Sequence, residues 1–446
     1  MIKLDSIREC LEGVIPGTMA TCDANGTPNV AYLSQVQFID NDHLALSYQF
    51  FNKTRQNIMA NPRAVLVVIS PATAAQYRLT IEYLRTETAG PLFESMKAKL
   101  AGIASHTGMS GVFKLLGSDI YRVHRIEQVD GKSVPAPASR NTLTALRACT
   151  EKLAHSCDLE QLLANTLTCL ERHFDIRHAM VLLYDQPNER LYTVASRGYE
   201  ASGVGSEIPL GHGVIGVAAR ERTAIRIGHM NAEYSYSRAI RESAEHSGWA
   251  GALETEIPFP GLAEARSQLA VPMLAAGRLL GVIYVESPQD LRFTYDDEDA
   301  LVTLATQLGM AMQLLHGVTE HAEEPAPPET VNDKPSGMNG APVVVRHFAA
   351  NDSVFLGDDY LIKGVAGSIF WTLLKDYTDR RRSEFTNREL RLDSRIRLPD
   401  VSDNLEARLI LLSKRLVERD CPVRIEKTGR GRFRLCVHRP VELSEH

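Results

Sequence analysis

Two polar, proline-containing segments interrupt an otherwise apolar-patterned chain of 446 residues, and they constrain its fold more than any other feature. The longer segment, 317–342, contains five prolines and several acidic residues and has no apolar periodicity. Because such a composition buries too little apolar surface to offset the entropy of ordering, we expect a disordered linker there. A shorter linker is expected at 131–142. Since the chain is too long for one ordinary core, the sequence predicts folded domains at 1–130, 143–316 and 343–440.

The composition excludes several classes of protein. No apolar run approaches the ~20 residues needed to span a bilayer, and the N-terminal MIKLDSIREC has acidic residues but no apolar core of a secretory signal. The cysteines are odd in number, scattered and without a C-x-x-C pair, which favours a reducing compartment over a disulfide framework. We therefore expect a cytoplasmic protein without membrane contact.

The first domain opens with a short helical segment and continues as strands. Thr18–Cys22 leads into Asp23-Ala24-Asn25-Gly26, a turn whose glycine suits a positive φ. Further strand candidates are 29–39, 44–48 and 64–70. Between the last two, FFNKTRQNIMANPR predicts a helical turn that ends at its Asn-Pro pair. Its cations and hydroxyl have the chemistry that phosphate recognition requires.

Three segments of this domain, MATCDANGTPNV, NKTRQNI and NPRAVL, resemble the pyridoxamine 5'-phosphate oxidase-like split barrel. The resemblance implies an FMN-binding domain that dimerises with the flavin at the subunit interface. It also implies that the basic stretch before N-P-R holds the flavin phosphate. The cofactor-binding residues would then be Lys53, Thr54, Arg55 and Asn57. Relatives of this fold also bind haem, another flavin or no cofactor, in which case these cations are surface charges.

The middle domain combines amphipathic helices with strands. Apolar residues recur at helical spacing within 143–174 and again within 296–315, and a hairpin is expected around Ala275–Arg278. The apolar faces of the helices exceed what one small sheet needs, so we expect two copies to pair through them. The strand candidates are 179–184, 191–196, 267–274 and 279–286.

Four segments in this domain, GHGVIG, RSQLAVPM, GVIYVES and FTYDDED, resemble the motifs of a GAF domain. The resemblance implies a small-molecule site between the sheet and residues 207–261, or a domain that only dimerises. Residues that could line such a pocket are His212, His229, His246 and Trp249, the alternative being solvated loop positions. We expect the helix cysteines Cys149, Cys157 and Cys169 to be inert, and we predict no metal site.

The last domain contains an amphipathic helix followed by a basic hairpin. Its apolar stripe is formed by Leu405, Leu409, Leu412 and Leu416. Between Asn404 and Arg439, ten basic residues stand against four acidic ones, an imbalance that favours a polyanionic partner. A helix of this kind can enter a major groove, while a neighbouring basic hairpin reaches phosphates or the minor groove.

This pattern resembles the winged-helix effector domain of bacterial response regulators. The resemblance rests on LSKRL in the helix, TGRGRFRL in the hairpin, LGDDYLIKGVAGSIFWTLLKDY and FTNRELRLD. It departs from the family at Arg432, where a glycine is usual, and in the unusually leucine-rich helix. It implies that double-stranded DNA is bound by Arg408, Lys414, Arg415, Lys427, Arg430 and Arg432. The alternative is a basic domain that does not bind DNA.

The sequence thus predicts a multidomain α+β chain: a split β-barrel, a GAF α/β/α sandwich and a winged helix. Sensing domains ahead of an output domain indicate a homodimeric, ligand- or redox-responsive transcriptional regulator. No Walker loop, zinc-protease helix or G-x-S-x-G motif occurs, and we assign no catalytic residue, so an enzyme is the less favoured interpretation. Two alternatives remain: a flavin- or haem-dependent oxidoreductase with regulatory domains, and a signalling scaffold that does not bind DNA.

Overall fold

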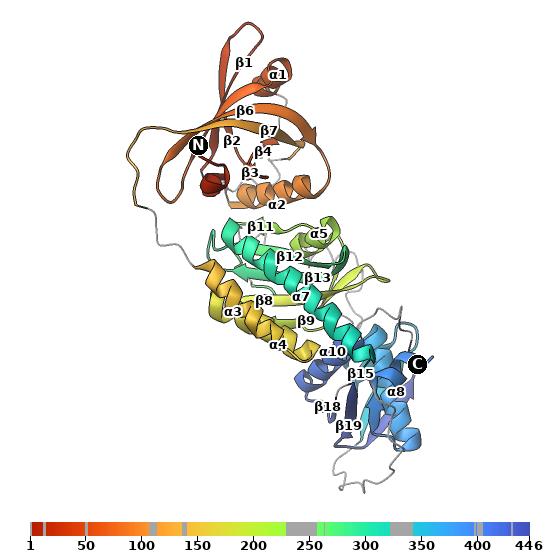
Figure 1. The fold of residues 1–446 in the computed structure, drawn as a ribbon. Coiled ribbons are helices and arrows are strands. Elements are labelled where there is room, and N and C mark those ends of the chain that lie inside the picture. Colours follow the sequence, from red (N-terminus) through yellow and green to blue (C-terminus); the bar gives the residue numbers. More distant parts are fainter. Residues whose placement is uncertain are drawn as a thin grey trace.

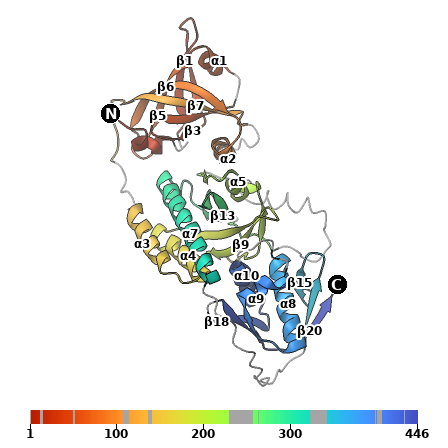
Figure 2. The same cartoon turned by 45° about the vertical axis from the view of Figure 1, so that its right-hand side comes forward.

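The computed structural model describes residues 2–11, 15–49, 52–106, 114–135, 141–228, 257–262, 264–321, 342–396, 398, 405–429 and 431–446. These residues form three units stacked end to end, in the order of the chain (Figure 1). The same order is seen after a 45° rotation (Figure 2). None of the described helices combines the length and the apolar character needed to cross a bilayer.

The N-terminal unit is a curled, antiparallel seven-stranded sheet in the order β2-β1-β5-β6-β7-β4-β3. Gly26 has φ +81° in the turn between β1 and β2, which confirms the expected turn. Met19, Leu66 and Leu79 alternate inward and form the core. The elements are η1 (Asp5–Leu11), β1 (Gly17–Cys22), β2 (Pro28–Leu33), β3 (Val36–Phe38), β4 (His43–Tyr48), α1 (Lys53–Ala60), β5 (Arg63–Ile69), β6 (Gln76–Glu87), α2 (Pro91–His106) and β7 (Gly117–Gln128).

The middle unit is a six-stranded sheet in the order β10-β9-β8-β13-β12-β11, with helices on both faces. Apolar side chains of α3, α4 and α7 cover one face, and those of α5 cover the other. Asp158 caps α4, since its side chain accepts a hydrogen bond from the amide of Gln161. The elements are α3 (Thr142–Ala154), α4 (Leu159–Phe174), β8 (His178–Asp185), β9 (Arg190–Arg197), β10 (Glu207–Pro209), α5 (Gly213–Glu221), β11 (Ile225–Ile227), β12 (Ser267–Ala275), β13 (Arg278–Ser287) and α7 (Tyr295–His321).

The C-terminal unit has a four-stranded sheet, β16-β15-β14-β20, and a three-stranded sheet, β17-β19-β18. Thr386 and Glu389 form a capping box that starts α9. β20 pairs in parallel with β14 and adds a strand beyond the predicted boundary at residue 440. The elements are β14 (Val343–Phe348), β15 (Ser353–Leu356), β16 (Asp359–Ile362), α8 (Gly364–Arg380), β17 (Glu384–Thr386), α9 (Asn387–Leu392), α10 (Leu405–Glu418), β18 (Val423–Gly429), β19 (Arg432–Val437) and β20 (Val441–Glu445).

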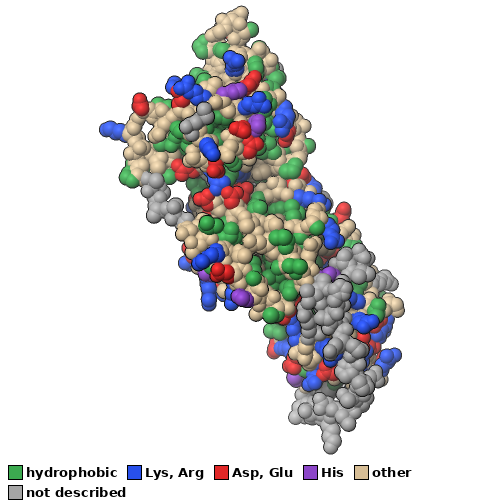
Figure 3. All heavy atoms as spheres, in the orientation of Figure 1, with side chains coloured by type: hydrophobic (Ala, Val, Ile, Leu, Met, Phe, Trp, Pro, Cys, Tyr) green, Lys and Arg blue, Asp and Glu red, His purple; other side chains and the backbone are tan. Residues whose placement is uncertain are grey.

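Adjacent units contact each other through charged and aromatic side chains at the first junction and through apolar side chains at the second. Where the barrel meets the middle unit, Arg8 of η1 donates a 2.6 Å hydrogen bond to Asp299 of α7. The neighbouring Tyr295 is buried there, with its ring centroid 4.2 Å from the guanidinium carbon of Arg226. Figure 3 shows side chains of both charges gathered at this seam. At the other end, one continuous apolar cluster joins the helical face of the middle unit to the C-terminal unit.

Candidate functional site

The first turn of α1 carries the residues predicted to hold a phosphate. The side-chain oxygen of Asn52 accepts a hydrogen bond from the amide of Arg55 and thereby starts the helix. Lys53 is half exposed, and its Nζ lies 3.2 Å from Oδ2 of Asp23. A hydrogen bond from the backbone of Thr27 and the ammonium of Lys53 together lower the pKa of Asp23. The Lys53 ammonium is therefore an accessible cation at the outer end of the site.

Arg55 points into the barrel wall. Its Nη1 lies 2.5 Å from Oδ2 of Asp119, and its Nη2 donates a 2.9 Å hydrogen bond to Thr86. The guanidinium carbon also lies 4.5 Å from the ring centroid of Tyr48. Burial raises the pKa of Asp119, although the hydrogen bond from Thr86 and the charge of Arg55 oppose that shift. This guanidinium is thus paired within the fold.

The remaining two predicted residues lie against neighbouring strands. Thr54 accepts a 2.9 Å hydrogen bond from Asn29 of β2. Asn57 is buried and donates a 3.1 Å hydrogen bond to Thr21 of β1, which ties the helix to the sheet. The structure therefore brings all four predicted residues together on α1. Among them, Lys53 is exposed and Thr54 is buried, while Arg55 and Asn57 tie the helix to the sheet.

In the middle unit, only one of the four residues predicted to line a pocket lies among the described residues. His212 precedes α5 and makes no side-chain capping bond. His229, His246 and Trp249 lie outside the described residues. Cys149 and Cys169 are buried on the helices, while Cys157 is exposed. Among the described residues, no three histidine, cysteine or acidic side chains are grouped so that they could hold a metal ion.

A buried carboxylate that the sequence did not suggest lies on the α5 side of the same sheet. Glu286 of β13 is 1% exposed, accepts a 2.8 Å hydrogen bond from the amide of Leu262, and accepts another from the Tyr284 hydroxyl. Burial raises the pKa of Glu286, and these hydrogen bonds oppose the shift. The carboxylate anchors the segment 257–262 across the sheet. In the sequence, the position of Glu286 within GVIYVES was the one feature associated with this residue.

α10 is buried on more than one face. The predicted stripe of Leu405, Leu409, Leu412 and Leu416 packs into the C-terminal unit. Ile410 and Leu411 are also buried, on the face turned away from that stripe. A Cβ placed on Gly205 would lie 3.7 Å from a methyl carbon of Leu411, so this second face rests on the middle unit. The contact accounts for the leucine-rich composition of the helix.

The three predicted DNA-binding residues of α10 all have protein partners. Arg408 forms an ion pair of 2.9 Å with Asp185, and its guanidinium carbon lies 4.2 Å from the ring centroid of Tyr192. Lys414 donates a 3.0 Å hydrogen bond to the carbonyl of Val194. Burial lowers the pKa of Lys414. Both side chains therefore face the middle unit.

Arg415, the third, is bound within its own unit. It donates a 3.1 Å hydrogen bond to the carbonyl of Leu361 and forms a 3.0 Å ion pair with Glu418. Burial lowers the pKa of Arg415 as well. In this arrangement none of the three helix cations faces solvent as the sequence led us to expect, because the second apolar face of α10 turns them toward protein.

The predicted residues of the hairpin differ among themselves. Lys427 of β18 forms an ion pair of 3.0 Å with Asp158 of the middle unit. Arg432 begins β19, pairs in register with Gly429 and is partly exposed. Arg430 lies outside the described residues. Sequence reasoning missed the acidic partners Asp158 and Asp185, because nothing in their local sequence distinguishes them from ordinary surface acids.

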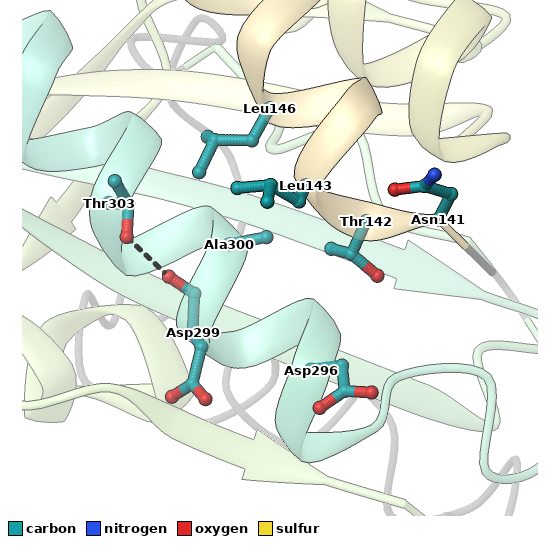
Figure 4. A pocket seen from close by; sticks show the side chains of 8 residues that line it. All are labelled: Asn141, Thr142, Leu143, Leu146, Asp296, Asp299, Ala300 and Thr303. Carbon is teal, nitrogen blue, oxygen red and sulfur yellow. Dashed lines mark hydrogen bonds between the residues drawn. The ribbon is translucent and has the colours of Figure 1, made fainter. Parts of the chain in front are cut away.

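An open groove of about 600 Å³ lies between the start of α3 and the first turns of α7 (Figure 4). Within it, Thr303 donates a 2.8 Å hydrogen bond to the backbone carbonyl of Asp299. Leu143 at the rim is 77% exposed, so the groove presents apolar surface to solvent. The lining residues are Asn141, Thr142, Leu143, Leu146, Asp296, Asp299, Ala300 and Thr303.

Two family models match separate parts of this chain. The model of the GAF domain matches residues 158–312, and the model of Pyridoxamine 5'-phosphate oxidase matches residues 4–113. The predictions of an N-terminal domain similar to that oxidase and of a GAF domain in the middle are thereby confirmed. A comparison with curated proteins finds no match.

Solved structures resemble single domains of the chain. The GAF domain of a phosphoenolpyruvate-protein phosphotransferase from Acinetobacter is 22% identical, with a TM-score of 0.32, over 41% of this chain and 98% of that one. A free methionine-R-sulfoxide reductase from Neisseria meningitidis is 21% identical, with a TM-score of 0.32, over 41% and 96%. An FMN-binding protein from Syntrophomonas wolfei is 20% identical, with a TM-score of 0.23, over 28% and 90%. At these TM-scores the likeness supports no functional conclusion.

Proposed function

We propose that this chain is a signal-responsive, DNA-binding transcriptional regulator. In this proposal the barrel and the GAF domain bind small molecules, and the C-terminal unit is a winged helix that contacts double-stranded DNA. The two family matches support the sensing part of the proposal, because domains of both kinds commonly bind small ligands. The DNA-binding part rests on the C-terminal unit alone.

The observation that carries the proposal is the order of elements in the C-terminal unit. Helices α8, α9 and α10 are followed directly by the hairpin β18–β19, and β17 joins that hairpin in one small sheet. A helix followed by a basic hairpin is a recurrent way to present a recognition element together with a phosphate-contacting wing. The partly exposed Arg432 stands at the turn of the hairpin, where such a contact would be made.

FMN is the proposed ligand of the barrel. The exposed ammonium of Lys53 is a charged donor that fits a phosphate monoester, and the buried Thr54 carries a hydroxyl beside it that also hydrogen-bonds to Asn29. Arg55 does not contribute, because its guanidinium is paired with Asp119. When bound, the flavin supplies a ring that accepts electrons. Of the chain's own residues, Lys53 and Thr54 bind the phosphate, and Asn57 fixes the helix that carries them.

The test of the proposed function is DNA retention by the full chain. Fluorescence anisotropy with labelled fragments from the protein's own promoter region, at two salt concentrations, should show binding that weakens as salt increases. Binding should also be tighter to a subset of fragments than to random DNA. If the full chain retains no DNA at low salt beyond what a neutral protein does, DNA binding is wrong, and the signalling scaffold replaces it.

A further inference from the structure

We propose that the outer face of the GAF domain around β8, β9 and the start of α4 is a docking surface for α10 and the hairpin, and that it competes with DNA for them. This inference rests on the proposed function. In the closed arrangement, Asp185 and Asp158 of the GAF domain pair with cations that would contact DNA phosphates in the DNA-bound arrangement. Regulation would consist of shifting the chain between this closed arrangement and an open, DNA-binding one.

The polar contacts of this interface pair cations of the C-terminal unit with oxygens of the GAF domain. Arg408 binds Asp185 at 2.9 Å, and Lys427 binds Asp158 at 3.0 Å. Lys414 donates to the backbone carbonyl of Val194 at 3.0 Å. All three cations belong to the set that the sequence predicts to contact DNA. The GAF domain therefore engages the same groups that a phosphate backbone would engage.

Two further contacts extend the interface on either side of α10. Lys363, just before α8, lies 3.3 Å from Glu207 of β10. Ser202, in the loop after β9, donates a hydrogen bond to Glu418 at the end of α10. Leu411 lies beside Gly205 between these contacts, next to Ile257, which is closer to this glycine. Figures 1 and 2 both place α10 between the GAF domain and α8. Nucleic acid therefore has no access to this face of the helix in the closed arrangement.

The interface combines the apolar cluster shared by the two units with buried charged side chains. Its helix cations are buried, which costs solvation free energy that a leucine or methionine would not cost. Oδ1 of Asp185, at the interface, is buried with no hydrogen-bond partner among the described residues. An unsatisfied buried polar atom costs free energy, which lowers the net stability of the closed arrangement. A binding role toward DNA in the open arrangement would explain why the helix carries cations at buried positions despite their desolvation cost.

The position of the docking surface also connects it to a sensing site. On β8, Asp185 follows Leu183 and Val181 on the face that carries α4. Met180 and Leu182 alternate with them and line the opposite face, beneath α5. Because the two faces share one strand, a ligand that displaces β8 from the α5 side displaces Asp185 as well. The docking surface can therefore respond to occupancy of the GAF domain.

The experiment compares DNA binding by the wild-type full chain with that of Asp185→Asn and Asp158→Asn. Asparagine keeps the size of each side chain, and at position 158 it also preserves the helix cap. We expect each variant to bind the promoter fragments at least tenfold more tightly than wild type. We also expect a larger radius of gyration by small-angle X-ray scattering. Asp175→Asn is the matched control, since Asp175 is an exposed GAF acid at the end of α4 whose carboxylate lies 3.7 Å from Arg177 and makes no ion pair with the C-terminal unit among the described residues.

The outcomes separate the inference from the function on which it rests. Equal DNA affinity and equal radius of gyration in the wild type and both variants would overturn the docking surface while leaving DNA binding intact. Absence of DNA binding in wild type and variants alike would overturn the proposed function. If Asp185→Asn does not fold, as a melting curve would show, the double variant Asp158→Asn/Glu160→Gln decides the question, because Lys427 lies on the hairpin, 3.0 Å from Asp158 and 3.6 Å from Glu160.

Discussion

The hydroxyl of Tyr284 lies 2.9 Å from a carboxylate oxygen of Glu286, two residues further along β13, and donates a hydrogen bond to it. Both side chains are buried on the α5 face of the GAF sheet, where Glu286 also receives the amide of Leu262. A carboxylate in this position gains donors but loses water. Since burial raises its pKa on balance, desolvation outweighs the hydrogen bonds.

The first prediction is that Glu286 makes the stability of the GAF domain depend on pH. Its folded pKa lies above the unfolded value of 4.5, so the folded state binds the proton more tightly. The contribution to stability is greatest below pH 4.5 and falls as pH rises through the folded pKa. Glu286→Gln removes the titration, so the wild type should lose stability relative to this variant between pH 4.5 and 7.

This difference is measured as the gap between the melting temperatures of wild type and Glu286→Gln across a pH series. Glu264→Gln provides the comparison for an exposed carboxylate in the same region of the chain. A gap for Glu286→Gln that is constant with pH would show that this carboxylate titrates normally.

The second prediction concerns the flavin phosphate. Lys53→Ala should weaken FMN binding by about 1.5–3 kcal/mol, the usual value of a hydrogen bond to a charged group, without lowering the melting temperature. Titration with FMN, followed by quenching of flavin fluorescence, measures the affinity. Arg78→Ala is the control, because Arg78 is an exposed arginine of the same barrel paired with Glu127. Unchanged affinity in Lys53→Ala would remove this residue from the site.

The helix α1 shows where sequence reasoning succeeded, and the pairing of Arg55 shows where it stopped. The motif NKTRQNI predicted a short helix with phosphate-binding chemistry, and local capping by Asn52 produces that helix. The motif could not show that Asp119, on β7, would pair with Arg55. That ion pair depends on the register between β6 and β7, which is set by the whole sheet.

The same limit applies to α10. The spacing of its leucines correctly predicted an amphipathic helix packed through Leu412 and its neighbours, and the hairpin that follows was also predicted. The second buried face at Ile410 and Leu411 was visible in the sequence as an excess of apolar residues. What covers that face is decided by a contact with a distant domain, and periodicity along one helix carries no information about such a partner.

The third prediction is that two copies pair through α7. Val302, Met310 and Leu314 are exposed at four- or eight-residue spacing, and so form an uncovered apolar stripe along one side of the helix. The double variant Met310→Glu/Leu314→Glu should weaken dimerisation of the full chain, as measured by light scattering over a concentration series. Leu392→Glu, an equally exposed leucine of the C-terminal unit, should have no effect. A dimer of unchanged strength in the double variant would place the interface elsewhere, for example on the barrel.

The last prediction concerns Arg432 and follows from its position. This arginine begins β19 at the turn of the hairpin and remains partly exposed while the α10 cations are covered. Although Lys427 of the hairpin is docked on the GAF domain, we expect Arg432 at the turn to reach a DNA backbone in the closed arrangement as well, with weak binding that does not depend on sequence. Because phosphate contacts set affinity and carry no sequence information, Arg432→Ala should weaken binding to promoter and random DNA equally. The slope of log affinity against log salt should become shallower by about one.

Arg147→Ala, which removes an exposed cation from α3, is the matched control and should leave the slope unchanged. A loss confined to the promoter fragment would instead show that Arg432 reads a base, since such a contact costs about 1–3 kcal/mol on the specific site only. An unchanged slope together with unchanged affinity would remove the hairpin from the DNA interface.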